Sequence, residues 1–398
     1  MKLKIFTGFL TGLVVPASTT PLFCQASSAG NNNFFCGSLP YISTGILNAE
    51  AVFNERILIN TSVRFLASAQ VDVGVKVSSA SVPTAPKAED FFIQGEEKYE
   101  KGDYQGAVAA YNEAIVLNPN YAEAYKNRGI ARFYLGDKEG ALADFNEALR
   151  INPNYADAYN SRGAARIDLG DKEGALADLN EALRINPNYA KAYKNRGIAR
   201  LYLGDKEGAI ADFNEALRIN PSDADAYKGR GLDRNSLGDK QGAIANYNEA
   251  LRINPNDANS YNNRGIARSD LGDKQGAIGD YNQALRINPN LFQAYNNRGN
   301  ARSGLGDKQG AIADYSEALR INPNYATAYY NRGNARSGLG DKQGAIADYS
   351  EALRINPNYA AAYYNRGVAR RDAGDKPGAI QDFQKAADLD RQQGDKDS

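Results

Sequence analysis

The stretch Y-K-N-R-G-I-A-R-F-Y-L-G-D, from Tyr125 to Asp137, decides the fold. It reads as a helix, yet Gly129 lies in its middle, where glycine costs about 1 kcal/mol relative to alanine. Nearly the same stretch, Y-K-N-R-G-I-A-R-L-Y-L-G-D, returns from Tyr193 to Asp205. Because the chain repeats an unfavourable residue, we interpret the glycine as a point of close contact with a second helix.

The recurrence has a fixed period. Asn-Pro dipeptides place a proline every 34 residues from Pro119 to Pro357. A period of 34 in a helical pattern predicts a solenoid of helix pairs. In this register there are nine units: 88–121, 122–155, 156–189, 190–223, 224–257, 258–291, 292–325, 326–359 and 360–393.

Each unit predicts its own two helices. A first helix runs to about Leu135, Gly136 takes the left-handed conformation that ends it, and Asp137 caps the second helix. That second helix spans 138–151, and Pro153 prevents its continuation. At the start of the first helix, the sequence predicts an N-cap at Asn120. Glu123 three residues later completes a capping arrangement, with Asn154 and Asp157 as a weaker version.

The paired helices are expected to meet at the glycine. Gly129 should face Ala141, Phe145 and Ala148, so that the missing side chain lets the two backbones approach. The same set returns as Gly197, Ala209, Phe213 and Ala216, and as Gly299, Ala311, Tyr315 and Ala318.

Composition excludes several classes of function. The 398 residues carry 47 acidic and 47 basic side chains, whereas a nucleic-acid binder usually has a basic excess. Histidine is absent, which removes imidazole acid–base chemistry and histidine metal sites. Acidic pairs such as Asp178 and Glu181 are copied from unit to unit, whereas catalysis needs one asymmetric constellation. We therefore expect no enzyme, no cofactor, no metal site and no small-molecule substrate.

The first residues resemble an export signal. A positive start at Met1 to Lys4 precedes an apolar stretch from Ile5 to Val15, with cleavage expected after Ala17 or Ala26. That stretch is too short to span a bilayer, which argues against a membrane anchor. Residues 1–26 are therefore predicted to be a signal peptide, in transient contact with the membrane, of a periplasmic, cell-envelope or secreted protein.

Residues 27–77 are harder to interpret. Valines alternate with other residues from Val71 to Val77, a period of two that suggests a strand, and the segment 56–60 could pair with it. Disorder, or docking on the repeats, is the open alternative. Cys24 lacks the small residues that precede a lipidated cysteine, and cleavage after Ala26 would leave Cys36 alone. Residues 78–87 are predicted to be a linker, and 394–398 a polar tail.

Residues 88–393 closely resemble tandem tetratricopeptide repeats, in the form typical of exported bacterial members. The resemblance is carried by Tyr125, Gly129, Ala141, Phe145, Ala148 and Pro153 and their equivalents. It implies an all-α fold, a right-handed superhelix (α-solenoid) of nine helix-turn-helix repeats. It also implies that the first helices line a concave groove that binds a peptide or protein.

Arginine departs from the family pattern in two columns, where apolar or aromatic residues are usual. The columns begin at Arg128 and Arg132, and in one interpretation their guanidinium groups pair with a column of aspartates. In the other, they form a ladder that binds anions. The neutral net charge favours pairing. The aspartates are Asp144, Asp178, Asp212, Asp280, Asp314 and Asp348.

An asparagine precedes most of the Arg-Gly pairs and is expected to face the groove. A carboxamide can match one peptide N–H and one C=O, so such a column could hold an extended guest by its main chain. The arrangement resembles the asparagine ladder of the O-linked sugar transferases that modify Ser and Thr. The alternative is that the amides only cap or hydrate a surface. This amide column consists of Asn127, Asn195, Asn263, Asn297, Asn331 and Asn365; Ser161 and Gly229 interrupt it.

The rest of the wall is predicted to change along the chain, from apolar and cationic in early units to polar and tyrosine-edged in late ones. An apolar wall that is exposed usually marks a contact surface. The leading candidates for anchoring a ligand are Lys126, Phe133, Tyr134, Lys191, Lys194, Leu201 and Tyr202. The family's clamp for a terminal carboxylate is incomplete here, because Ile130, Ser161 and Asn195 fill its other places.

Three functions remain at this level. The leading one is a non-enzymatic scaffold that binds an extended segment of another exported protein. A second is a structural array that associates with itself, which the near identity of units 7 and 8 favours somewhat. The third is an accessory subunit of an envelope enzyme.

Overall fold

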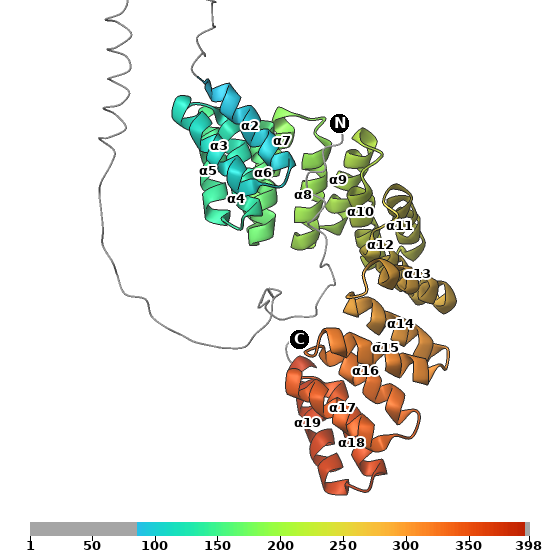
Figure 1. Cartoon of the computed structure of the whole chain (residues 1–398). Coiled ribbons are helices and arrows are strands. Elements are labelled where there is room, and N and C mark those ends of the chain that lie inside the picture. Colours follow the sequence, from blue (N-terminus) through green and yellow to red (C-terminus); the bar gives the residue numbers. More distant parts are fainter. Residues whose placement is uncertain (1–85, 395–398) are drawn as a thin grey trace, which may run out of the picture. The chain divides into compact units, whose positions relative to one another are not determined.

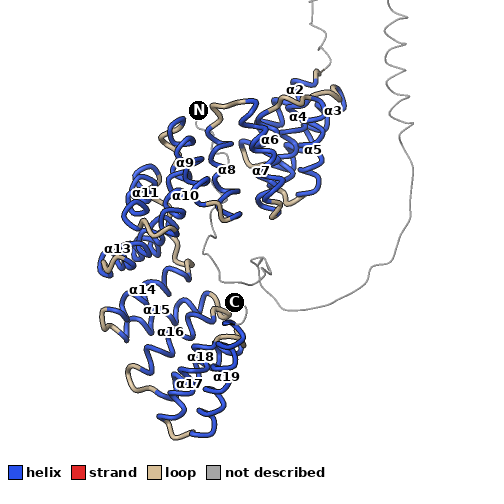
Figure 2. The backbone as a smooth tube through the Cα atoms, turned by 180° about the vertical axis from the view of Figure 1, so that it is seen from behind, coloured by secondary structure: helices blue, strands red, loops and turns tan. Residues whose placement is uncertain are grey.

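The computed structural model describes residues 86–394, which form 18 helices (Figure 2). No strand occurs within this range. The predicted signal peptide, the strand predicted in 27–77, most of the linker and the end of the tail lie outside the described residues. None of the described helices is long and apolar enough to cross a membrane.

The helices alternate between first and second members of the nine units. The first helices are α2 (Ala88–Glu100), α4 (Ala122–Tyr134), α6 (Ala156–Leu169), α8 (Ala190–Leu203), α10 (Ala224–Ser236), α12 (Ala258–Asp270), α14 (Phe292–Gly304), α16 (Ala326–Ser337) and α18 (Ala360–Asp372). The second helices are α3 (Tyr104–Leu117), α5 (Lys138–Ile151), α7 (Lys172–Ile185), α9 (Lys206–Ile219), α11 (Lys240–Ile253), α13 (Lys274–Ile287), α15 (Lys308–Ile321), α17 (Lys342–Ile355) and α19 (Lys376–Gly394).

Each helix packs against its neighbours in the chain, as in a solenoid (Figure 1). The two helices of a unit make the most extensive contact, and each second helix then packs on the next first helix. Successive first helices also touch, whereas successive second helices do not touch anywhere in residues 86–394. The first helices therefore lie on the inner side of the local bend between adjacent units. The predicted all-α solenoid of nine helix pairs is confirmed.

The turn inside each unit forms as the sequence predicts. Gly136 has φ +85°, the left-handed conformation that glycine adopts without strain. Asp137 then caps α5, where its carboxylate accepts a hydrogen bond from the backbone N–H of Gly140 at 2.9 Å. Eight further glycines at this place have positive φ; they are Gly102, Gly170, Gly204, Gly238, Gly272, Gly306, Gly340 and Gly374.

The predicted cap at Asn120 is wrong. Helix α4 has Tyr121 at its N-cap position, with no side-chain hydrogen bond there. The asparagine that shapes the turn is Asn118, before the proline: its Oδ1 accepts a hydrogen bond from the backbone N–H of Asn120 at 3.1 Å. Asn152 holds the next turn in the same way. An Asx turn of this kind replaces an N-cap because the asparagine bonds the backbone two residues on.

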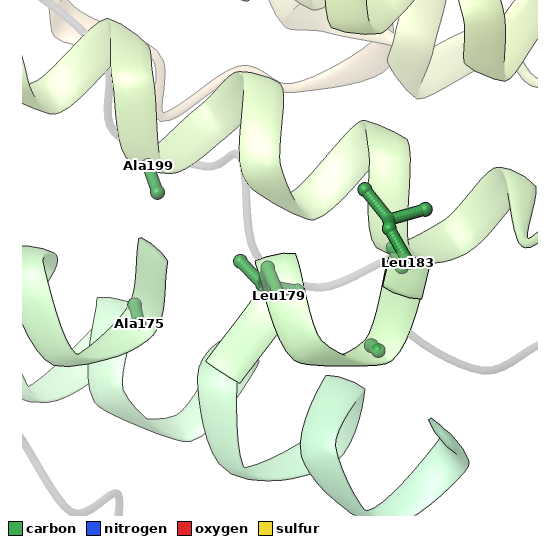
Figure 3. Packing of buried hydrophobic residues seen from close by; sticks show 6 residues of the cluster. Ala175, Leu179, Leu183 and Ala199 are labelled. Carbon is green, nitrogen blue, oxygen red and sulfur yellow. The ribbon is translucent and has the colours of Figure 1, made fainter. Parts of the chain in front are cut away.

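The core is built from small side chains and one large ring or leucine per unit. Between α7 and α8, Leu179 and Leu183 pack with Ala175 and Ala199 (Figure 3). The predicted glycine contact is confirmed: a Cβ added to Gly129 would lie 2.8 Å from Cε1 of Phe145. Real Cβ atoms essentially never approach that closely, so only glycine allows this helix pair to close as it does.

Candidate functional site

The arginine columns bind aspartate within units 2–4 and 6–9. In unit 2, Arg128 donates from Nε and Nη2 to the two carboxylate oxygens of Asp144, at 2.9 and 2.6 Å. Arg132 donates from Nη1 to the same carboxylate at 2.9 Å, and Asp144 is only 3% exposed. Arg128 also reaches the preceding second helix, where its Nη1 donates to Oδ1 of Asn112 at 2.7 Å. Paired donors on one carboxylate are among the strong hydrogen bonds of proteins, and the structural interpretation of the arginines is confirmed.

We call two arginines on one buried aspartate an arginine clasp. It joins the two helices of a unit, and the asparagine contact links that unit to the one before. The clasp recurs as Arg162, Arg166 and Asp178; Arg196, Arg200 and Asp212; Arg264, Arg268 and Asp280; Arg298, Arg302 and Asp314; Arg332, Arg336 and Asp348; and Arg366, Arg370 and Asp382.

The amide column forms bonds between successive first helices. Asn297 donates from Nδ2 to Oδ1 of Asn262 at 3.0 Å, and Asn331 donates to Oδ1 of Asn296 at 3.0 Å. Asn365 donates to the hydroxyl of Tyr330 at 3.0 Å. In each pair the acceptor lies 35 residues earlier, on the first helix of the preceding unit. Some of the hydrogen-bonding groups of these amides therefore connect successive units, which the sequence argument did not predict.

The two earliest members of the column are engaged in a similar way, and one member differs. Asn127 donates to Oε1 of Glu96 at a long 3.4 Å, and Asn195 donates to Oδ1 of Asn160 at 2.9 Å. Asn263 instead accepts a bond from its neighbour Asn262 at 3.3 Å.

Two of the predicted wall residues are buried. Lys194 and Asn195 are each 8% exposed, and Nζ of Lys194 lies 3.1 Å from a carboxylate oxygen of Asp223. Their placement on an exposed wall is corrected: Lys194 pairs with the residue that caps α10, and Asn195 bonds the first helix of the preceding unit. The same column holds Lys228, whose Nζ lies 3.0 Å from carboxylate oxygens of both Asp225 and Asp257.

Carboxylates lie near the predicted cationic start of the wall. Burial lowers the pKa of Lys126, and the nearest charges that oppose this shift are three carboxylates. They are Asp157, Glu96 and Glu123, all exposed, on α6, α2 and α4. The Nζ of Lys126 lies 5.8 Å from the centre of the Tyr155 ring. Acidic side chains therefore accompany the predicted apolar and cationic start of the wall.

The aromatic and apolar candidates are partly packed at contacts between helices and partly exposed. Phe133 packs on the core cluster around Phe145, and Leu201 packs on the cluster around Phe213. Tyr134 is 37% exposed and stacks on the ring of Tyr104 at 4.9 Å. These side chains are only partly available to a guest.

Two further candidates remain accessible. Tyr202 is 39% exposed, and Lys172 of the preceding unit donates to its backbone oxygen at 3.0 Å. Lys191 is half-buried and forms no ion pair with any residue in 86–394. Binding of a peptide by the candidate residues stays a prediction.

Carboxamides with fixed orientations lie on the first helices of late units. Oδ1 of the exposed Asn300 accepts the hydroxyl of Tyr315 at 2.8 Å. Oδ1 of the exposed Asn334 accepts the hydroxyl of Tyr349 at 2.8 Å and Nδ2 of Asn365 at 2.9 Å. These asparagines belong to the polar late part of the predicted wall, but the sequence argument missed their orientation, because it depends on tyrosines of the second helices.

Unit 5 differs from the others in several ways. Gly229 replaces the column asparagine, and Asn246 replaces the clasp aspartate. Asp233 stands where units 2–4 and 6–9 have alanine; it is 0% exposed, and neither carboxylate oxygen has a hydrogen-bond partner. The nearby hydroxyl of Tyr247 is also buried without a partner. Burial raises the pKa of Asp233 to about 7.

Comparisons with known families agree with this architecture. Models described as "Tetratricopeptide repeat" match residues 122–155, 156–189, 190–223, 258–291, 326–359 and 360–393. A model described as "TPR repeat" matches 95–136, 231–272 and 305–340. Because these matches together cover most of residues 95–393, the chain belongs to the tetratricopeptide repeat proteins. No curated protein sequence matches it.

Solved structures align with parts of this chain. The APC/C hetero-tetramer Cut9-Hcn1 aligns with a TM-score of 0.51 at 17% identity, over 76% of this chain and 73% of that one. MamA from Desulfovibrio magneticus RS-1 aligns with a TM-score of 0.40 at 25% identity, over 43% of this chain and 96% of that one. YrrB, described as a TPR protein with an unusual peptide-binding site, aligns with a TM-score of 0.40 at 22% identity, over 46% and 95%.

Proposed function

We propose that this protein is an interaction scaffold that binds an extended segment of another protein along its first helices. Tetratricopeptide repeats support a role in protein–protein interaction. The segment would lie across α14, α16 and α18, where the outward-facing carboxamides are concentrated. We further propose that both proteins are exported, from the signal-like residues 1–26; N-terminal sequencing of the mature chain tests this.

The orientation of the amides carries the proposal. Oδ1 of Asn300 and Asn334 is held by tyrosine hydroxyls, so their Nδ2 groups are free to donate outward. Nδ2 of Asn297 and Asn331 donates to the preceding unit. Their Oδ1 atoms accept no hydrogen bond from residues 86–394 and are not among its buried unpaired atoms. Donors and acceptors thus occur on the same first helices, which matches the N–H and C=O groups of an extended backbone.

A peptide held in this way would be recognised mainly by its main chain. The late first helices carry few charges that could recognise a guest side chain. Their exposed Asn300 and Asn334 take the place of apolar residues of earlier units. Affinity would come from several modest hydrogen bonds, each worth about 1 kcal/mol. We therefore expect broad specificity and weak binding per unit.

The test removes the donors and keeps the internal bonds. In the double variant Asn300→Asp and Asn334→Asp, each side chain still accepts its tyrosine hydroxyl but loses its outward N–H. Partners captured by cross-linking in the native compartment would first be identified, and their segments titrated by fluorescence anisotropy. We expect affinity to fall by about tenfold or more, since two hydrogen bonds are lost.

The matched control is Asn146→Asp, an exposed asparagine on the second helix α5 that accepts a bond from Arg162. It makes the same chemical change away from the first helices and should leave binding unchanged. Equal affinity in the double variant and the control would contradict the proposal. If no partner is captured and the apparent molar mass from light scattering rises with protein concentration, self-association would be favoured instead.

A further inference from the structure

The site of interest is the altered arginine clasp of unit 5. In unit 7 the intact clasp places Nη2 of Arg298 at 2.6 Å from Oδ1 of Asp314. Nη1 of Arg302 lies 2.9 Å from Oδ2 of the same carboxylate. Each intact clasp therefore holds two positive charges on one negative charge, and the carboxylate is nearly inaccessible.

In unit 5 a neutral amide takes the place of the carboxylate. Nε of Arg230 donates to Oδ1 of Asn246 at 2.9 Å, and its Nη1 donates to Oδ1 of Asn214 at 2.6 Å. Nδ2 of Asn246 donates to the carbonyl oxygen of Gly242 at 2.8 Å. In the other clasps, the second arginine approaches the equivalent carbonyl, as Arg200 does at 3.0 Å from that of Gly208.

Two guanidinium groups are consequently left without their usual acceptor. Within residues 86–394, Nη2 of Arg230 and Nη1 of Arg234 have no hydrogen-bond partner. The nearest carboxylate to Arg234 is that of Asp239, whose Oδ2 lies 3.8 Å from Nε and whose side chain is 53% exposed. A contact that long and that exposed contributes little.

The remaining charges leave the arginine pair uncompensated. Burial and the positive charge of Arg234 together lower the pKa of Arg230 below its usual range. Asp233, the acidic residue between the two arginines on α10, forms no hydrogen bond with either of them. The side chain of Arg234 is 33% exposed, so solvent reaches the outer arginine of the pair.

We propose that Arg230 and Arg234 form a binding site for a carboxylate supplied by another molecule. The same pair of arginines holds an internal carboxylate in seven other units, which defines the chemistry that these two side chains fit. A planar guanidinium presents parallel N–H donors that match the two oxygens of a carboxylate. The guest group is an Asp or Glu side chain, or a chain terminus, of a partner protein. This site lies apart from the amides of α14 and α16 and does not depend on them.

The test follows the arginine side chains directly. Full-length protein would be titrated with three short peptides at low ionic strength, while the Nε–H resonances of Arg230 and Arg234 are recorded by NMR. One peptide carries an aspartate between blocked ends, one carries only a free C-terminal carboxylate, and one carries asparagine between blocked ends. We expect saturable shifts with a carboxylate peptide and none with the asparagine peptide. The two carboxylate peptides show which source the site prefers.

Two reciprocal variants give the decisive comparison. Asn246→Asp restores the internal carboxylate found in the other units, so the array should fold and the peptide affinity should fall at least tenfold. Asp314→Asn should create a second site, with new shifts at Arg298 and Arg302. If Asp314→Asn does not fold, Asn246→Asp and Arg234→Gln decide the matter, because both should lower the affinity for the carboxylate peptide. Unchanged shifts in Asn246→Asp, or equal shifts with the asparagine peptide, would overturn the proposal.

Discussion

Replacing Asp233 by alanine should stabilise the protein, and more so as the pH rises. The carboxyl is fully buried without a hydrogen-bond partner. Burial is the main cause of its raised pKa, and the charges of Asp205 and Glu207 add to the shift, while Lys206 opposes it. Alanine is the residue at this place in units 2–4 and 6–9, so the variant should pack normally.

The magnitude follows from the difference between two pKa values. The unfolded carboxyl ionises near its ordinary pKa of 3.8, whereas the folded one holds its proton to about pH 7. Folding therefore takes up a proton between these values, and the free energy of unfolding falls as pH rises through this window. Each pKa unit corresponds to about 1.4 kcal/mol, so the full loss is about 4 kcal/mol. The gain from Asp233→Ala should grow by up to this amount between pH 4 and pH 8.

The assay needs a local as well as a global measurement. Urea unfolding followed by circular dichroism at pH 4.5, 6 and 8 gives the global free energy. Amide hydrogen exchange in α10 and α11 reports the opening of unit 5 itself, which matters because repeat arrays need not unfold in one step. Asp233→Asn is the control: it has the same shape and no titration, so its pH dependence should follow that of Asp233→Ala.

One result would refute the reasoning. If wild type and Asp233→Ala differ by the same free energy at pH 4.5 and pH 8, the buried carboxyl does not hold its proton in the folded state. A wild-type slope shared by Asp233→Asn would contradict the reasoning equally, since asparagine cannot titrate.

Further predictions concern the contacts between helices. Gly299→Ala should destabilise the protein by about 1 to 3 kcal/mol in urea unfolding, because the new Cβ would lie 2.6 Å from Cε1 of Tyr315. Gly279→Ala, where nothing lies within 4 Å, should instead stabilise helix α13 by up to about 1 kcal/mol. Asp314→Ala leaves two arginines without their carboxylate and should cost about 3 to 5 kcal/mol in thermal or urea unfolding. Asn331→Ala removes one bond between first helices, and hydrogen exchange at the ends of α14 and α16 should accelerate by about tenfold.

Periodicity was sufficient to predict the fold. The glycine at 129, the left-handed Gly136 and the capping Asp137 each have one physical solution, and the structure adopts it. The N-cap at Asn120 failed because two asparagines flank the proline and both can bond the backbone. Which of them does so depends on the geometry of the turn, which composition does not reveal.

The candidate site was harder to predict because its side chains interact across units. The amides were correctly assigned to the first helices, but their partners lie 35 residues away. A pattern read within one unit does not reveal a partner in another unit. Lys194 looked exposed for the same reason: the carboxylate it contacts belongs to the turn before the next unit. The altered clasp of unit 5 was present in the sequence as Asn246 and could have been noticed from the aspartate column alone.

The one-sided contact between units has a mechanical consequence. Because successive first helices touch and successive second helices do not, we expect each joint to resist closing more on the side of the first helices than on the other side. Small rotations of this kind add along the array, so the distance between its ends can change while every helix pair stays intact. A bound segment that separated neighbouring first helices would reduce the bend at each joint and so move the two ends of the array apart.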